Sequence, residues 1–416
     1  MAHDHKHAHA HPDTVVTTRV DELETLGELF DKCLPAFGGA ILRRVYQILD
    51  EAVGRGCPLT LAVAGPVTVS DQHRTWLNPL IETGWVAYLS TTDAVCYHDG
   101  HRALDRRATP VFSVPLWGDD KALRDEHTIR VADLGFAEDV LFEQDRFITA
   151  LLRLPRFQKK MSGTEFRYLL GEAYAAQEKQ NGITSGLLAT CTRMAIPILV
   201  GAPADGSAFL NSMKLWAMAR AGLLEHKFEL DLHAEVFESC AYHHWGLFES
   251  EAKALGTLIL GGGVPKNFNL QPEPALSQIF GLTDVTGYAF DVQIVSAPVT
   301  DGSLSSCPPA EAVTWGKVDK DTYQQTTESL QGDFSMLMPF VVRALLENRQ
   351  RYEKWHAKMG DALFEKHPKA RGYLRDRAGY RLFEHRDRLT ARLLERVREQ
   401  KDFLAESMEY PLAIAK

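Results

Sequence analysis

The chain has 416 residues, of which 45% are hydrophobic and 24% charged, so it is long enough for one large globular domain or two smaller ones. Its 46 Lys and Arg against 55 Asp and Glu give a net charge of −9, which disfavours a nucleic acid partner because such binding needs a cationic face. The six cysteines form no CxxC pair and no apolar run has membrane-spanning length, so we expect a cytoplasmic protein that neither spans nor crosses a membrane.

The chain opens with MAHDHKHAHAHP, which is rich in histidine and has no apolar periodicity. We therefore expect residues 1–20 to form a flexible tail or tag outside the fold. The alternative is metal scavenging, because imidazoles on a flexible chain bind Zn²⁺ or Ni²⁺ without a folded site.

Five short apolar runs end abruptly in small or polar residues and have the length of strands. Their nearly continuous apolarity indicates that both faces are buried, as in a parallel sheet. Helical stretches at 209–222 and 232–254 are long enough to cross between parallel strands. The sequence thus predicts an α/β fold with a doubly wound, mostly parallel, Rossmann-like sheet. The predicted strands are 59–64, 86–89, 196–200, 255–260 and 288–295.

Polar and glycine-rich loops follow these strands, at the sheet edge where parallel sheets bind their ligands. The GxGxxG fingerprint is missing, so a dinucleotide site must use other loops. Beyond residue 340 the chain becomes charged and helical, which is most simply an added layer on the sheet domain or a subunit contact. We therefore expect a tail at 1–20, a catalytic domain at 21–345 and a helical extension at 346–416.

The segment DGSLSSCPPAEAVTWGK at 301–317 is the most informative stretch, because it places Glu311 and Trp315 shortly before Lys317. A lysine in a partly dry, apolar site has a lowered pKa, so its free amine can form a Schiff base near neutral pH. An indole can stack on an alkylammonium ion, and a carboxylate can pair with it or move its proton. Spacing alone also fits an exposed lysine beside a core tryptophan.

The segment EAVTWGK at 311–317 resembles the EAVSWGK-type motif of the deoxyhypusine synthase family, whose lysine carries a covalent imine. Four more segments agree in order and spacing, and the resemblance covers about residues 36–346. They are PADGS at 203–207, LGGGVPK at 260–266, DGSLSS at 301–306 and GDFSMLMP at 332–339.

This resemblance implies a parallel-sheet fold, bound NAD, and a homotetramer with active sites at subunit interfaces. It further implies that NAD takes a hydride from the carbon beside a substrate amine, usually that of spermidine. Lys317 would then hold the aminobutyl group as an imine and pass it to an acceptor amine, after which the hydride returns. The partner implied is thus a small amine or polyamine.

The same resemblance assigns residues to three roles. Asp205 and Asp333 are expected to accept hydrogen bonds from ribose hydroxyls. The catalytic positions are Lys317, Glu311, Trp315, Asn267 and His98. The cofactor positions are Gly65, Val67, Thr68, Thr92, Asp93, Ala94, Asp205, Gly262, Ser296, Ala297, Asp301, Ser305, Asp333 and Phe334. The substrate positions are Tyr97, His98, Leu210, Asn211, Gly302, Ser303, Leu304, Glu311 and Trp315.

Several positions depart from the family's pattern. Asn267 stands where the family has a histidine base, and an amide cannot accept that proton at neutral pH. Leu210 and Leu304 replace aspartates that pair with the cationic ends of spermidine, and Tyr97-His98 replaces an acidic pair. Because each lost carboxylate leaves an ammonium unpaired, these changes favour a related donor or acceptor, such as putrescine giving homospermidine. His98 or Glu311 would then move the proton.

Other interpretations of the chain stay open at this point. His98 and His101 could bind a metal, but no further ligand is suitably spaced, so hydrogen-bonded loop histidines are favoured and no metal site is expected. His243 and His244 are adjacent on a predicted helix and point in different directions, so they cannot chelate together. The rival functions are amine oxidation by NAD without transfer, and a non-catalytic relative that acts through NAD or protein binding.

Overall fold

A computed structural model describes residues 15–65, 67–104 and 111–411, so most of the predicted tail lies outside the described residues. Its centre is a six-stranded sheet in which every neighbouring pair is parallel, in the order β11-β10-β9-β1-β2-β7. All five predicted strands are present, which confirms the doubly wound α/β fold. The strands are β1 (Leu59–Val63), β2 (Val86–Thr91), β7 (Ile198–Val200), β9 (Gly256–Leu260), β10 (Phe290–Val295) and β11 (Thr327–Gln331).

The chain builds this sheet outward from β1 in two directions. It first adds β2 and β7 on one side, and then returns to add β9, β10 and β11 on the other. Strands β1 and β9 are parallel neighbours, but the chain continues from their carboxyl ends in opposite directions along the sheet, to β2 and to β10. Such a switch in strand order opens a crevice, which is where open parallel sheets bind ligands.

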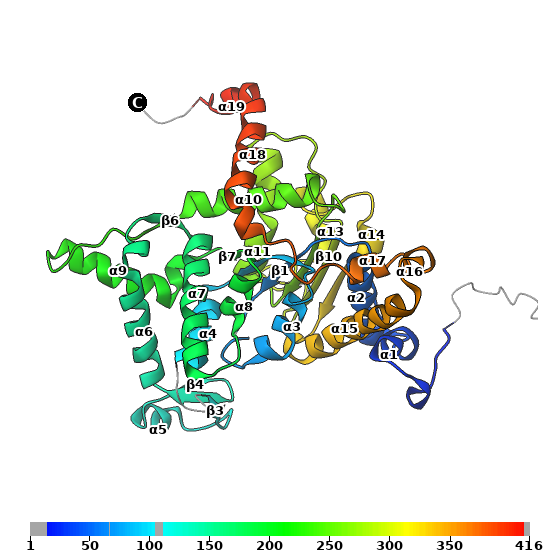
Figure 1. The fold of residues 1–416 in the computed structure, drawn as a ribbon, viewed down its shortest axis with the longest axis horizontal. Coiled ribbons are helices and arrows are strands. Elements are labelled where there is room, and N and C mark those ends of the chain that lie inside the picture. Colours follow the sequence, from blue (N-terminus) through cyan, green and yellow to red (C-terminus); the bar gives the residue numbers. More distant parts are fainter. Residues whose placement is uncertain (1–14, 66, 105–110, 412–416) are drawn as a thin grey trace, which may run out of the picture.

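Helices cover both faces of the sheet (Figure 1). Alternate residues of β9 serve the two faces: Leu258 and Leu260 belong to the main core under α2 and α15, and Ile259 belongs to a smaller core with Leu270 of α11. The larger helices are α1 (Leu26–Cys33), α2 (Phe37–Gly54), α4 (Asp93–Leu104), α6 (Asp139–Leu152), α7 (Gly163–Asn181), α8 (Leu187–Arg193), α9 (Ser207–Arg220), α10 (Leu232–Phe248), α11 (Gly263–Leu270), α15 (Phe334–Met359), α18 (Arg386–Glu399) and α19 (Lys401–Ser407).

Shorter elements connect these helices and strands. A three-stranded sheet in the order β3-β5-β4 lies between α4 and α6, and β6 pairs with β8; the sequence predicted neither. None of the helices within the described ranges combines the length and apolarity needed to cross a bilayer. The remaining bounds are β3 (Phe112–Ser113), β4 (Thr128–Val131), β5 (Leu134–Ala137), β6 (Lys160–Ser162), β8 (Glu229–Asp231), α3 (Asn78–Ile81), α5 (Asp120–Asp125), α12 (Pro272–Pro274), α13 (Pro309–Ala312), α14 (Tyr323–Thr326), α16 (Ala362–Lys366), α17 (Ala370–Tyr373), and the short turns η1 (Val20–Glu22), η2 (His73–Leu77), η3 (Pro155–Phe157), η4 (Pro203–Asp205), η5 (Ala275–Ile279), η6 (Val313–Trp315) and η7 (Leu382–His385).

The charged C-terminal helices are part of the core. Position 346 lies inside α15, whose Val341 and Leu345 pack in the same cluster as Tyr352 and Tyr373 further along the chain. On the other face of the sheet, α18 packs against α10. The helical segment after residue 345 therefore completes the packing of both faces.

A buried carboxyl lies on β10, one strand in from the edge of this sheet. Asp291 of β10 is 1% exposed, and its Oδ1 has no hydrogen-bond partner among the described residues. Burial raises its pKa to about 7, although the positive charge of Lys266 acts in the opposite direction. Because the native state then binds a proton that the unfolded chain releases at its ordinary pKa of 3.8, stability falls as pH rises between about 4 and 7.

We expect Asp291→Asn to unfold at a higher temperature than the wild type at pH 8, where it removes a buried negative charge, and to differ little at pH 5. Thermal unfolding followed by circular dichroism at the two pH values measures this. Asp321→Asn, at an exposed carboxylate paired with Lys320, is the control and should change neither value. A variant less stable than the wild type at pH 8 would contradict the expectation.

Candidate active site

The turns after β1 and β9 meet at the switch in strand order. Ala64 N donates to Leu260 O at 2.9 Å, and Gly65, Gly261 and Gly262 all have positive φ, at 84°, 86° and 74°. A Cβ on Gly261 would lie 3.1 Å from that of Ala64, and one on Gly262 would lie 2.6 Å from Ser305 O. Only glycine allows this close approach, and the bare backbone that it leaves suits a dinucleotide.

The start of α15 closes the same crevice. Phe334 places its ring 3.8 Å from the position of a Cβ on Gly65, with its edge toward Trp76 at 6.4 Å between ring centroids. Asp333 caps α15, because Oδ1 accepts from Ser335 N at 2.8 Å, while the residue stays exposed. The structure thus brings together the predicted cofactor positions Gly65, Gly262, Ser305 and Phe334.

Two other predicted cofactor residues lie at the far end of the sheet. Asp93 is buried at the start of α4, and its Oδ2 accepts from Ala208 N of α9 at 3.0 Å. Burial raises the pKa of Asp93 to about 6. A Cβ on Gly206 would lie 2.1 Å from Asp93, so glycine is required there. The Asp93 carboxyl therefore ties α4 to α9, whereas the neighbouring Asp205 is exposed.

Asp205 and Asp333 follow opposite edge strands, β7 and β11. Five strand spacings separate those edges, which is about 24 Å. The two residues therefore lie on loops that follow opposite edges of the sheet. The remaining cofactor positions follow the strands as well: Thr92 precedes α4 and Ala94 lies in its first turn, Val67 and Thr68 follow β1, Ser296 and Ala297 follow β10, and Asp301 lies beyond them.

Lys317 lies in the crossover between β10 and β11. Its carbonyl accepts from Tyr288 N at 3.0 Å, so its backbone runs beside the amino end of β10, not the carboxyl end where the loops gather. Its side chain is half-buried, Nζ lies 5.8 Å from the centroid of the Trp315 ring, and burial lowers its pKa. Trp315 is 58% exposed, so the interpretation of a core tryptophan is wrong.

Two residues that the sequence did not single out complete this cluster. Lys266 of α11 is 9% exposed, and its Nζ donates to Gln293 Oε1 at 2.8 Å and to Cys307 O at 2.6 Å, with Ser305 O at 3.3 Å. Burial lowers the pKa of Lys266. The pKa of the Cys307 thiol is raised by burial and by the Glu311 carboxyl.

Lys266 thus connects the glycine turn to the loop that leads toward Lys317. Its position one turn into a helix after LGGG was the available signal, because such a side chain points back toward the turn. Asn267, the next residue, is exposed, and no side-chain hydrogen bond of Asn267 occurs among the described residues. Gly302, Ser303 and Leu304 are also exposed on this loop, Leu304 by 65%.

A second group of predicted substrate residues gathers around Asp145 of α6, another residue that the sequence did not single out. Its Oδ1 accepts from Tyr97 Oη at 2.9 Å and from Asn211 Nδ2 at 2.7 Å. Asn211 Oδ1 in turn accepts from Lys214 Nζ at 3.0 Å. Leu210, beside Asn211 on α9, is 51% exposed. The Asp145 group therefore joins α4, α6 and α9.

His98 belongs to helix α4, so its interpretation as a loop residue is wrong. Its Nδ1 lies 2.9 Å from His101 Nε2, which makes the two rings a hydrogen-bonded pair. Burial lowers their pKa values to about 4 and about 3, respectively, so both are neutral at pH 7. Elsewhere, His243 on α10 bonds Tyr88 Oη at 3.1 Å and pairs with Glu273, as a structural histidine does. Within the described ranges, no three metal-binding side chains come together.

The two groups of predicted substrate residues stay apart in one chain. The Lys317 cluster lies by β10, and the Asp145 group lies beyond β2, three strand spacings or about 14 Å further along the sheet. Figure 1 places α9 and α13 on opposite sides of the molecule. A single chain therefore does not bring His98, Leu210 and Asn211 to Lys317.

We expect Gly262→Ala to weaken NAD binding about tenfold, because the new Cβ would collide with Ser305 O in a backbone conformation that already disfavours side chains. Gly263→Ala is the matched control: φ there is 62°, yet nothing lies within 4 Å of the added Cβ. Titration of both variants with NAD measures the difference. Equal losses in the two variants would show that the contact with Ser305 has no effect.

Comparison with known proteins shows the family of the chain. The family model of deoxyhypusine synthase matches residues 26–345. A deoxyhypusine synthase-like protein of Nostoc sp. is 36% identical over 321 residues, which cover 77% of this chain and 80% of that protein. A probable deoxyhypusine synthase 2 of Methanosarcina mazei is 28% identical over 326 residues, which cover 78% and 87%. The family carries out NAD-dependent aminobutyl transfer. The chain belongs to the deoxyhypusine synthase family.

Proposed function

We propose that this protein is an NAD-dependent aminoalkyl transferase that carries the transferred group as an imine on Lys317. The observation that supports this most directly is the half-buried Lys317 amine, whose pKa is lowered and which lies beside Trp315. A lysine in that state supplies the free amine that imine exchange needs near neutral pH.

NAD bound at the glycine turns would accept a hydride from the substrate carbon that bears the amine, and would later return it. Once that carbon is part of a C=N bond, Lys317 Nζ adds to it and the amine portion of the donor leaves with a proton. The aminoalkyl group is then held on Lys317 as an imine. An acceptor amine adds to the same carbon, Lys317 leaves, and return of the hydride gives the product amine.

Glu311 is the better candidate for moving protons. It shares the Lys317 cluster, where its carboxyl acts on Cys307 and on Lys266. His98 lies in the other group, with a pKa lowered to about 4, which makes it a weak base at neutral pH. Asn267 cannot take this role.

We further propose that the active site forms between subunits of a homotetramer. Support comes from the separation of the two groups within one chain and from the exposed apolar side chains beside each of them. Trp315 and Leu304 are 58% and 65% exposed near Lys317, and Leu210 and Trp216 are 51% and 56% exposed on α9. Large apolar side chains left open in this way are typical of surfaces that another subunit covers.

The charges around the Asp145 group favour a small diamine donor of the putrescine type, with homospermidine as a product. Leucines occupy two positions where spermidine would need acids, and Asp145 is the carboxylate that bonds both Tyr97 and Asn211. The Lys214 ammonium lies one hydrogen bond away from Asp145, through Asn211. One carboxylate matches one distal ammonium, and a third cationic centre would be left unpaired at a cost of several kcal/mol.

Trapping tests the proposal. With NAD and a panel of diamines and polyamines, borohydride should fix an aminoalkyl adduct on Lys317, located by peptide mass spectrometry. Lys317→Ala should give no adduct and no turnover, whereas Lys320→Ala, at an exposed lysine, should keep both. Net accumulation of NADH without an adduct would instead support amine oxidation. Biological activity that survives Lys317→Ala would support the non-catalytic alternative.

We expect Asp145→Asn to raise KM for the diamine about tenfold and to change kcat much less, because the variant leaves the distal ammonium without its counter-charge. Glu143→Gln, on an exposed position of the same helix, is the matched control and should leave both constants unchanged. Steady-state kinetics with putrescine and with spermidine measure the effect. An unchanged KM for putrescine would exclude Asp145 from the donor site.

A further inference from the structure

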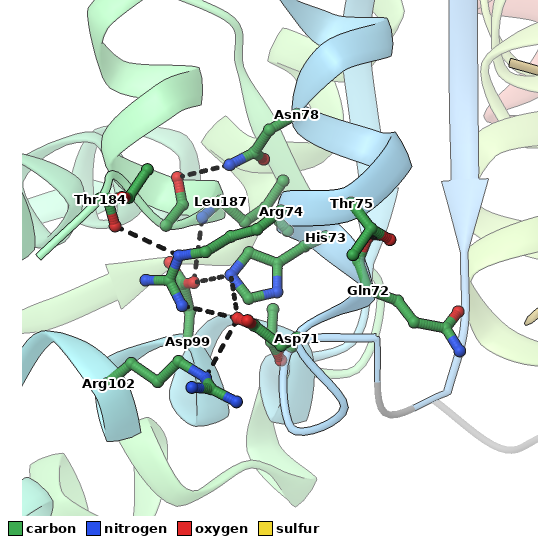
Figure 2. Close-up of polar contacts among 12 residues, drawn as sticks. Asp71, Gln72, His73, Arg74, Thr75, Asn78, Asp99, Arg102, Thr184 and Leu187 are labelled. Carbon is green, nitrogen blue, oxygen red and sulfur yellow. Dashed lines mark hydrogen bonds and ion pairs between the residues drawn. The ribbon is translucent and has the colours of Figure 1, made fainter. Parts of the chain in front are cut away.

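A buried, charged cluster lies beneath the loop that follows β1 (Figure 2). At its centre is His73, the first residue of η2, which is 1% exposed. Its Nδ1 donates to Val67 O at 3.2 Å, and its backbone N donates to the same carbonyl at 3.1 Å. On the opposite side of the ring, Nε2 lies 3.2 Å from Asp99 Oδ1. One side chain therefore spans from the loop to helix α4.

The Asp99 carboxylate is held in place by backbone hydrogen bonds. Its two carboxylate oxygens accept from Leu187 N at 2.9 Å and from Leu188 N at 2.8 Å, at the start of α8. Burial by itself raises the pKa of Asp99, but His73 and these two N–H groups outweigh it, and the net shift is downward. A charged carboxylate held by two helices cannot follow the loop if the loop moves.

The rest of the loop is held as well. Thr68 Oγ1 donates to Val95 O on α4 at 2.9 Å. Asp71 adopts the left-handed region with φ of 63°, and its Oδ1 pairs with Arg74 at 2.7 Å and Arg102 at 3.0 Å. Figure 2 shows these two arginines reaching Asp71 beside His73. A left-handed non-glycine residue costs about 1 kcal/mol or more, so other contacts must enforce this conformation.

We propose that His73 is a positioning residue for the cofactor: through Val67 O and Asp99, it fixes the backbone at 67–71 against the dinucleotide crevice. This inference rests on the placement of NAD at the end of β1. The Val67 carbonyl accepts two hydrogen bonds from His73 and a longer one, at 3.4 Å, from Ser70 of the same loop, so His73 is what ties that peptide to Asp99. A buried polar contact contributes little net stability, whereas it can select one conformation over another.

Three variants at His73 separate its two contacts. Asn carries a donor at the position of Nδ1, and Gln carries one at the position of Nε2, so His73→Asn can keep the bond to Val67 and His73→Gln can keep the contact with Asp99. His73→Phe removes both. We expect His73→Gln and His73→Asn each to weaken NAD binding about tenfold, because each breaks one end of the link between Val67 O and Asp99, and His73→Phe, which breaks both ends, to weaken it at least as much.

The control is His243→Asn, at an equally buried histidine away from the loop, which can keep the bond to Tyr88 and removes the contact with Glu273. It should lower the unfolding temperature and leave the Kd for NAD unchanged. Calorimetry measures the affinity for NAD, and thermal unfolding identifies any variant that fails to fold. If His73→Phe or His73→Gln does not fold, His73→Asn is compared with the wild type instead.

NAD affinity in His73→Gln equal to that of the wild type overturns the proposal. So does a loss of the same size in His243→Asn, since that would show a general effect of destabilisation. A wild-type protein that binds no NAD overturns the placement of the cofactor itself, and with it the proposed transferase, which is a result distinct from the other two.

Discussion

The structure depends on the close approach of two glycine turns where β1 and β9 diverge. The backbone there can approach Ser305 and Phe334 only without side chains of its own, since a single Cβ on Gly262 would occupy the space of the Ser305 carbonyl. The same Ser305 carbonyl accepts from Lys266 Nζ, which also donates to Cys307 O. Lys266 thus links the cofactor crevice to the loop that leads to Lys317, the residue that we propose as the carrier of the substrate.

Much of the fold could be predicted from local patterns, because a strand buried on both faces has a short, nearly continuous apolar sequence, which few other elements have. Strand β11 was not predicted. Its sequence, TESLQ, is mostly polar, which suits an edge strand that is only partly buried. The small sheet of β3, β4 and β5 was not predicted either, since many of its residues are exposed or half-buried and they form no continuous apolar run.

The site was predictable only where its chemistry is concentrated in a motif. Glu311, Trp315 and Lys317 are close in the sequence and come together in the structure, whereas Asp145 and Lys266 gain their roles from residues 66 and 41 positions away. A contact between residues so far apart in the sequence cannot be predicted from a local pattern. The separation of the predicted substrate residues into two distant groups could not be predicted either, because a motif indicates residue types and not the distances between strands. In the Asp145 group, the carboxylate belongs to α6 and bonds Asn211 of α9, the residue next to Leu210.

Helix α15 links the crevice to the far end of the chain, since Phe334 begins it beside Gly65, and Asn348 and Tyr352 lie further along it among aromatic side chains of the C-terminal segment. Asn348 Nδ2 donates to Tyr46 Oη and to Asp50 of α2, and Tyr373 Oη donates to the same aspartate. A protein shortened to residue 345 would keep every motif of its family and still lose the scaffold that orients Phe334. The segment after residue 345 thus belongs to the packing that fixes Phe334 beside Gly65, and changes within it would act on the glycine turns along helix α15.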